Sequence, residues 1–214
     1  MIELLILICN QEKELKKVLK KYKLSYNAMT YGSGTASLSL LHYFGLDEVK
    51  KSIYFSLIPS SISFNLLDEL ENKLNLKEKG KGIGFTISLT STNKFLKDNF
   101  DLTYKGEAKM NNDSNYELIV TIVKAGYSDV VMQSAKKVGC NGGTVIEGRS
   151  LGTSRTIFMN LAIEPEKDIV INIVHKNIKK QVMENINKET GIKTEARGLL
   201  ISLPINEVIG LADD

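Results

Sequence analysis

Residues 117–148, ELIVTIVKAGYSDVVMQSAKKVGCNGGTVIEG, decide the fold that we predict for this chain. The stretch opens with Glu117–Val123, an apolar run that is typical of a buried strand. Ser128–Val138 then predicts a helix, because its apolar residues recur at helical spacing and Gly139 follows as a stop signal. Thr144–Glu147 predicts a second, short strand. A strand, a helix and a strand in this order form one half of a βαββαβ unit.

The other half of the unit follows directly along the chain. Asp168–Val174 carries apolar residues on one parity and predicts a third strand. The four-residue spacing of Ile178, Val182 and Ile186 predicts a second helix, and Leu199–Leu203 predicts the fourth strand. With one helix after the first strand and one after the third, the pattern indicates an antiparallel sheet with both helices on one face.

The first part of the chain repeats this order of elements. It predicts helices over 12–23 and 61–75 and strands at Glu3–Cys9, Tyr26–Tyr31, Ser52–Ile58 and Ile83–Leu89. The two parts align without a gap over their central region, so that Gly32 matches Gly148 and Gly82 matches Gly198. The apolar residues keep both their strand and their helix periods in this alignment. We interpret the chain as a tandem repeat.

The sequence therefore predicts an α+β fold of two ferredoxin-like βαββαβ units in tandem, with antiparallel sheets and helices on one face. We place the first unit at residues 1–100, a linker at 101–115 and the second unit at 116–214. The strands carry apolar residues on both parities, which indicates cover on both sheet faces. We therefore expect the open faces to be buried against other copies.

The composition of the chain argues against several classes of function. The net charge of +3 comes from 28 basic and 25 acidic residues, which is too near balance to favour nucleic acid as a partner. Two isolated cysteines, Cys9 and Cys140, provide neither a disulfide framework nor a metal cluster. Met1–Asn10 is a short apolar run with no features of a signal peptide. We expect a cytoplasmic protein.

Four stretches of the second unit resemble the P-II family of signalling proteins in their order and spacing. They are Leu118–Val123, Gly142–Gly148, Glu164–Ile171, and the segment from Thr190 to Pro204. The resemblance covers nearly all of the second unit. The first unit joins it only through the repeat, as a degenerate P-II-like unit. The resemblance implies a ferredoxin-like fold and a homo-oligomer built from trimeric rings of units.

The function that the resemblance implies is regulation rather than catalysis. P-II proteins bind ATP or ADP between subunits and dock a long loop on a target protein. We therefore expect a regulator that senses a small anionic ligand between units and modulates a target enzyme or membrane transporter, in nitrogen regulation. The residues alone fix no cofactor, and ATP or ADP is the candidate. Two family lysine positions are occupied by Leu199 and Glu166.

Seven residues are candidates for ligand binding. Glycines allow backbone N–H groups to approach an anion, and an arginine adds a bidentate partner, which favours the segment Gly148–Thr153. The resemblance adds residues near a subunit cleft. The full set is Thr144, Gly148, Arg149, Gly152, Lys193, Arg197 and Gly198. Alternatives stay open for these positions: a flexible turn with a solvated arginine, a surface turn before the last strand, and a strand threonine that faces solvent.

We find no nucleophile, general base and orienting group that form a catalytic set. His175 and Asp129 are expected at the starts of helices, and Asp168 on a solvated loop. Two other function classes remain as alternatives. One is an enzyme on the same fold, since a fold does not determine function. The other is an RNA-binding module, which requires exposed aromatic residues on the sheet and a basic face.

Overall fold

The computed structural model describes residues 2–24, 27–34, 49–91, 114–149, 156–158, 161–163 and 166–211. The chain divides into two compact units that interleave along the sequence. Unit 1 consists of Met1–Tyr31, Lys51–Ser114 and Pro204–Asp214, and unit 2 consists of Gly32–Lys50 and Asn115–Leu203. The units predicted at 1–100 and 116–214 followed the chain without interleaving.

Unit 1 is built around its first strand. Its elements are β1 (Ile2–Cys9), α1 (Glu12–Lys21), β2 (Asn27–Gly34), β3 (Val49–Pro59), α3 (Ser60–Lys73), β4 (Gly82–Ser88) and β11 (Glu207–Ile209). The strand order is β2-β3-β1-β4-β11. β1 is antiparallel to β3 on one side and to β4 on the other, so that Ile6 lies opposite both Phe55 and Phe85. The strand with the longest apolar run therefore takes the centre of the sheet.

Both helices of unit 1 pack against the same face of β1. Leu5, Leu7 and Cys9 alternate along β1 and belong to one buried cluster with the two helices. The helices contribute apolar residues at helical spacing: Leu15, Val18, Leu19, Leu66, Leu67 and Leu70. Each fully buried leucine or valine stabilises the fold by roughly 1.5–3 kcal/mol relative to exposure. This cluster therefore holds unit 1 together.

Unit 2 has a sheet with the strand order β10-β5-β9-β6. Its elements are β5 (Tyr116–Lys124), α5 (Ser128–Lys136), β6 (Thr144–Arg149), β9 (Glu166–His175), α6 (Lys176–Thr190) and β10 (Leu199–Pro204). β9 is antiparallel to both β5 and β6. Ser33 and Gly34, at the end of β2 that belongs to unit 2, also pair with β6. A separate antiparallel pair, β7 (Thr156–Phe158) and β8 (Leu161–Ile163), comes between β6 and β9 along the chain.

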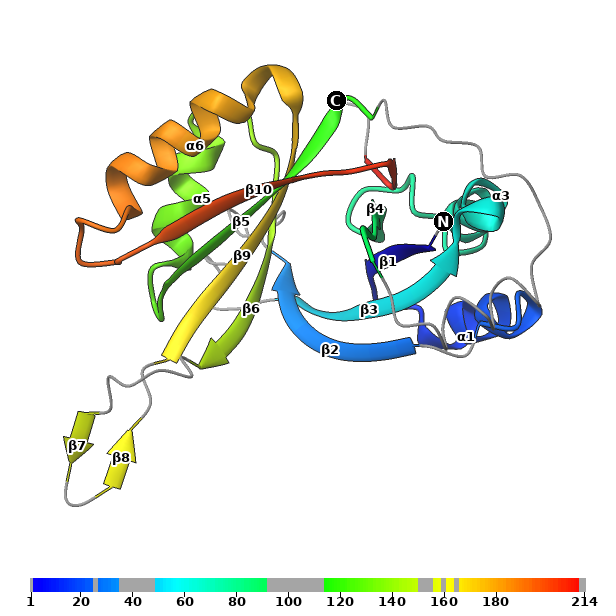
Figure 1. Ribbon diagram of the computed structural model, residues 1–214, viewed down its shortest axis with the longest axis horizontal. Helices are drawn as coiled ribbons and strands as arrows, with labels where there is room; N and C mark the ends of the chain where they lie inside the picture. Colours follow the sequence, from blue (N-terminus) through cyan, green and yellow to red (C-terminus); the bar gives the residue numbers. More distant parts are fainter. Residues whose placement is uncertain are drawn as a thin grey trace. The chain divides into compact units, whose positions relative to one another are not determined.

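The helices of unit 2 also cover a single face of their sheet. Figure 1 shows α5 and α6 on one side of β10-β5-β9-β6. Ile119 and Val123 of β5, with Val170 and Val174 of β9, pack against these helices. The helix side supplies Val131, Met132, Ala135, Val182 and Ile186. The opposite parity of the strands lies on the face without helices.

The predicted mixed fold, with antiparallel strand pairs and four described helices, is confirmed. In each unit the first and third strands are central and the second strand lies beyond the third, which is the ferredoxin-like arrangement. A repeat origin of the two units stays a prediction. The sequence did not predict β7, β8 or β11. No helix in the described part of the chain is long and apolar enough to cross a membrane.

The C-terminal segment returns to unit 1. β11 pairs with β4, with Glu207 opposite Thr86. The backbone N–H of Asn206 donates to the Thr86 carbonyl at 2.9 Å, and its side-chain amide donates to the Ser88 hydroxyl at 2.7 Å. Ile209 packs against the core of unit 1. β11 therefore extends the first sheet, although the predicted second unit included its residues.

The acidic residue of β11 gives this segment a pH dependence. Burial raises the pKa of Glu207, and the nearby carboxylate of Glu3 raises it further. A carboxyl group with a higher pKa in the folded state binds more protons when folded, so stability falls as the pH rises from its unfolded pKa to its folded pKa.

We therefore predict that Glu207→Gln raises the melting temperature at pH 7, where Glu207 is ionised in the unfolded chain. The gain should shrink as the pH falls towards about 4, near the ordinary pKa of glutamate. Scanning calorimetry across this range checks the prediction. The exposed Glu184, whose ion pair with Lys180 is long at 3.9 Å, provides the control Glu184→Gln. An equal gain from both substitutions, or a gain that grows in acid, would contradict the assignment.

Candidate functional site

The first group of candidate residues lies along β6. Thr144 begins this strand, pairs with Ile171 of β9 and Gly34 of β2, and is only 6% exposed. The alternative of a strand threonine that faces solvent is therefore wrong. Thr144 is a residue of the sheet, and its neighbours in the ladder are backbone groups of two other strands.

Gly148 and Arg149, which we predicted at the start of a glycine-containing loop, lie in β6. They lie opposite Lys167 and Glu166 of β9. The strand continues because β9 extends far enough to pair with it, and opposite charges directly across a ladder are favourable. The prediction that these two residues lie in a loop is therefore wrong, although the Arg149 side chain is exposed. Gly152 lies outside the described residues.

The second group lies in the turn between α6 and β10. Gly198 is buried there, its N–H donates to the Thr190 carbonyl at 2.7 Å, and it forms an isolated bridge with Gly191. A Cβ atom at Gly198 would lie 2.1 Å from the Thr190 oxygen, so that only glycine fits. Lys193 and Arg197 are both exposed on this turn. The turn is therefore a rigid support for two exposed cations.

Arg197 has an unusual backbone. Its φ is +47°, in the left-handed region that favours glycine. An L-residue with a Cβ atom pays roughly 1–2 kcal/mol for this conformation. Non-glycine residues in such positions cluster at functional sites, where the surrounding structure holds them in place. The backbone of Arg197 therefore supports a role for its side chain, independently of any resemblance.

The two groups lie at the same end of the unit 2 sheet. Gly148 is opposite Lys167, Lys167 is opposite Lys124, and the Lys124 N–H donates to the Ala196 carbonyl at 2.9 Å. β9 and β5 therefore separate Arg149 from the Arg197 turn. At a strand spacing of about 4.8 Å, the two backbones are roughly 14 Å apart. The arginines share an end of the sheet but do not face one another across a single narrow pocket.

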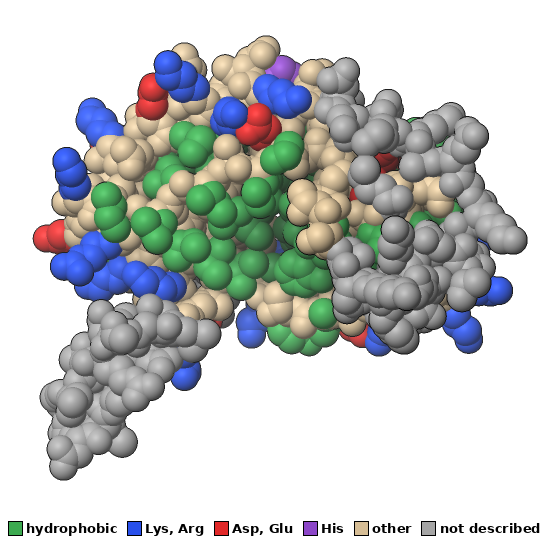
Figure 2. Space-filling view, in the orientation of Figure 1, with side chains coloured by type: hydrophobic (Ala, Val, Ile, Leu, Met, Phe, Trp, Pro, Cys, Tyr) green, Lys and Arg blue, Asp and Glu red, His purple; other side chains and the backbone are tan. Residues whose placement is uncertain are grey.

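Other cations gather at this end. Lys124 and Lys193 are exposed and Lys167 is half-buried, with Glu147, Glu166 and Glu195 near them in the sequence. Figure 2 shows Lys and Arg side chains grouped over the turn that enters β10. Such a group favours an anion, because fixed positive charges replace part of the hydration that the anion loses.

Two residues considered for acid–base chemistry have structural roles. Asp168 is 7% exposed within β9 and accepts a hydrogen bond of 2.9 Å from the Gly126 N–H, so its prediction as a solvated loop residue is wrong. His175 precedes α6, and its Nδ1 accepts from the Asn177 N–H at 3.2 Å, as expected for a helix start. Among the described residues, no three His, Cys, Asp or Glu side chains are grouped as metal ligands.

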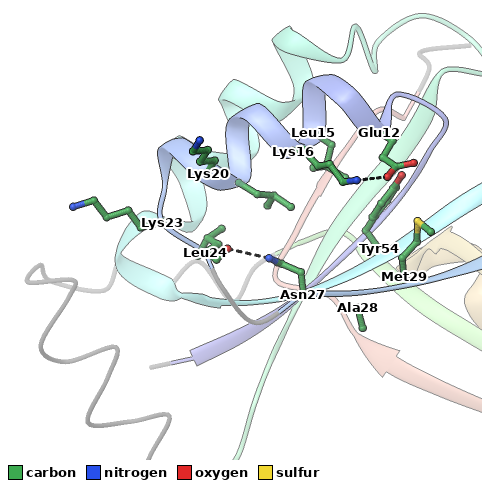
Figure 3. A pocket seen from close by; sticks show the side chains of 11 residues that line it. Glu12, Leu15, Lys16, Lys20, Lys23, Leu24, Asn27, Ala28, Met29 and Tyr54 are labelled. Carbon is green, nitrogen blue, oxygen red and sulfur yellow. Dashed lines mark hydrogen bonds and ion pairs between the residues drawn. The ribbon is translucent and has the colours of Figure 1, made fainter.

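Sequence reasoning missed a groove in unit 1. It lies between α1 and strands β2 and β3, with a volume of about 540 Å³ (Figure 3). Its lining consists of Glu12, Leu15, Lys16, Leu19, Lys20, Lys23, Leu24, Asn27, Ala28, Met29 and Tyr54. The lysines had been interpreted only as the polar face of an amphipathic helix. Only the position of β2 beside the helix reveals the groove.

Comparisons with known proteins find only limited similarity to this chain. No family model matches the chain, and no curated protein matches it. Among solved structures, Arabidopsis thaliana PII bound to citrate is 20% identical, with 44% of this chain and 78% of that chain covered and a TM-score of 0.34. B. subtilis GlnK is 18% identical, with 44% and 95% covered and a TM-score of 0.31.

A third solved structure, an unknown protein from Galdieria sulphuraria, is similar over a longer span. It is 11% identical, covers 94% of this chain and 96% of its own chain, and has a TM-score of 0.31. All three likenesses are too slight to fix the fold or the function of this chain.

The Arg197–Gly198 turn leads to a stability prediction. Arg197→Gly should leave the free energy of unfolding unchanged or raise it by up to about 1 kcal/mol, because glycine adopts the left-handed backbone freely. Gly198→Ala should lower it by about 1–3 kcal/mol, because its Cβ atom is forced against the Thr190 carbonyl. Urea unfolding measures both. Similar losses from the two substitutions would mean that the Arg197 side chain itself stabilises the turn.

Proposed function

We propose that the protein is a P-II-like regulator that binds a small anionic ligand at the cationic end of the unit 2 sheet. The observation that carries this proposal is Arg197, an exposed arginine held at φ +47°. It stands at a position that the P-II resemblance assigns to the ligand cleft. The ferredoxin-like strand order of unit 2 is compatible with that resemblance. ATP, ADP or a small carboxylate such as citrate, which the Arabidopsis protein binds, are the candidate ligands.

We further propose that unit 1 is a degenerate P-II-like copy without this ligand site. The repeat alignment pairs Lys81 with Arg197, and the first 100 residues contain no arginine. Lys81 lies 3.5 Å from Glu78, so that its charge is already partly balanced. The tandem arrangement and the boundaries of the two copies belong to this proposal.

Self-association is the second part of the proposal. The face of the unit 2 sheet without helices carries aliphatic side chains. On β10, Leu199, Ile201 and Leu203 are 56%, 51% and 36% exposed. Figure 2 shows a broad group of hydrophobic side chains on this part of the molecule. An apolar patch on an edge strand is a common interaction site. We propose that it meets other copies of the chain, in rings of three units.

A regulator also needs a partner to which it transmits ligand binding. We propose that the segment between β6 and β9, which includes β7 and β8, contacts a target enzyme or membrane transporter in the cytoplasm. The β7–β8 pair forms a two-stranded sheet of its own within this segment. A role in nitrogen regulation follows from the family resemblance and remains part of the proposal.

The two alternative functions, an RNA-binding module and an enzyme, receive less support from the described residues. An RNA-binding sheet requires aromatic side chains on adjacent central strands, whereas the open face of β5 and β9 carries aliphatic pairs, Val120 with Ile171 and Ile122 with Ile169. For an enzyme, the described histidine and the buried Asp168 already serve the helix start and the β5–α5 turn.

The ligand prediction is tested by a thermal-shift screen against ATP, ADP, AMP, cyclic nucleotides, 2-oxoglutarate and citrate, followed by calorimetry on variants. Arg149→Ala and Arg197→Ala should each weaken binding of the selected compound by about tenfold to a hundredfold, because each removes a charged partner that contributes about 1.5–3 kcal/mol. Lys81→Ala in unit 1 is the control and should change little. Equal loss from Lys81→Ala would indicate that both units bind. No loss from either arginine would place the site elsewhere.

The association prediction is tested by light scattering at micromolar concentration. The wild-type particle should exceed the 23.8 kDa of one chain, and Ile201→Asp should reduce its mass, because a carboxylate on the apolar face opposes burial. Phe64→Asp is a matched control, since Phe64 is 66% exposed on α3 in unit 1. A wild-type mass of one chain, or equal effects from both substitutions, would contradict the proposal.

A further inference from the structure

The groove in unit 1 has an apolar floor. Leu15, Leu19 and Leu24 line it and are at most 8% exposed, and Met29 on β2 forms a wall at 41% exposure. Its volume of about 540 Å³ is that of a site for a small organic molecule. None of these residues belongs to the cationic end of unit 2. The groove is therefore separate from the site proposed above.

One end of the groove is cationic. Lys20 and Lys23 lie at the end of α1, beside Leu24, and Figure 3 shows both at this end, with the Lys23 side chain extended away from the groove. Lys16 forms an ion pair with Glu12 at 2.5 Å, towards the other end. Within the described part of the chain, neither Lys20 nor Lys23 has an ion-pair partner. An apolar groove with two lysines at one end, whose long side chains can turn towards a head group, is complementary to an anion with an apolar tail.

The backbone of Lys23 provides a second, independent observation. Lys23 ends α1 in a Schellman turn, in which the Leu24 N–H donates to the Leu19 carbonyl at 3.0 Å. Its φ is +52°, at a position where glycine is usual. The corresponding turn after α3 uses Asn75, with φ +50°, and asparagine tolerates this conformation better than lysine does. A lysine in place of glycine at this position therefore indicates a function for its side chain.

The aromatic ring of Tyr54 closes the inner end of the groove. Tyr54 is 8% exposed, and its hydroxyl makes no hydrogen bond of acceptable geometry in the described structure. Burial raises the pKa of Tyr54, while the neighbouring Ser52 opposes this shift. Figure 3 shows Tyr54 beside Glu12 and Lys16, so its ring closes the groove opposite Lys20 and Lys23.

We propose that this groove binds an amphipathic carboxylate, with its carboxylate between Lys20 and Lys23 and its unbranched apolar chain along Leu15, Leu19 and Leu24 towards Tyr54. Burial of the chain supplies affinity in proportion to its apolar area. The two ammonium groups select the sign of the head group. Unit 1 thereby gains a ligand of its own, of a chemistry different from that expected for unit 2.

Calorimetry on the full chain with decanoate, below its aggregation concentration, tests the head group and the chain. Decanoate should bind with one molecule per chain. Decanol should bind more weakly, while decylamine and acetate should not bind measurably. Equal binding of decanoate and decylamine would overturn the proposal, as would several decanoate molecules per chain or no binding at all. Preferential binding to phosphatidylglycerol vesicles over free decanoate would also overturn it, in favour of a membrane surface.

Variants on the same helix test the lysines. Lys20→Gln and Lys23→Gln should each weaken decanoate binding by roughly tenfold, the lower end of the range for a lost charged partner. Lys13→Gln is the matched control, because Lys13 is exposed on α1 but does not line the groove. An equal effect from Lys13→Gln would reduce the finding to a general charge effect and overturn the proposal.

Substitutions in the strained turn at Lys23 distinguish a role in ligand binding from a role in folding. Lys23→Gly should weaken decanoate binding as Lys23→Gln does, yet keep or raise the melting temperature, since glycine suits the backbone at this position. Asn75→Gly changes the equivalent turn of α3 and should leave decanoate binding unchanged. A lower melting temperature for Lys23→Gly, or unchanged decanoate affinity, would mean that Lys23 serves the fold alone.

Discussion

The backbone of each unit's first strand must be paired on both of its edges. β1 lies between β3 and β4, and β5 lies between β9 and β10, while helices cover one face of each. Buried N–H and C=O groups without partners are costly, so the third and fourth strands of a unit are required beside its first. The second strand is then left beyond the third. This strand order determines where the helices, the turn at Arg197 and the groove beside α1 lie.

The two sheets differ in whether a further strand covers their outer edge, and the proposed functions follow from this difference. In unit 1, the free edge of β4 is covered by β11, and the Gly210 N–H adds a hydrogen bond of 3.3 Å to Glu71 of α3. In unit 2, β10 is the last strand of its sheet and carries exposed aliphatic side chains. Edge strands of this kind attract other chains unless they are covered. The proposed association therefore involves unit 2, whereas the groove proposed to bind a small molecule lies in unit 1.

Periodicity was sufficient to predict the long elements, because apolar residues at strand or helix spacing have only one way to be buried. It could not predict β11, whose three residues pair only because the edge of β4 is available. Arg149 was placed in a loop because strand length depends on how far β9 extends. The burial of Asp168 and the positive φ of Arg197 and Lys23 have no sequence signal, since each depends on the surrounding turn. The sequence thus named candidate residues for a site, but it could not give the geometry in which the structure holds them.

Hydrogen exchange on a chain that lacks residues 206–214 tests most directly the claim that edge pairing organises each unit. If β11 completes the sheet of unit 1, amides of β4 and β1 should exchange faster in the shortened chain, while those of β5 and β9 keep their protection. This is the opposite of what a C-terminal segment belonging to unit 2 would produce. Faster exchange in β5 and β9, with β4 and β1 unchanged, would contradict the account.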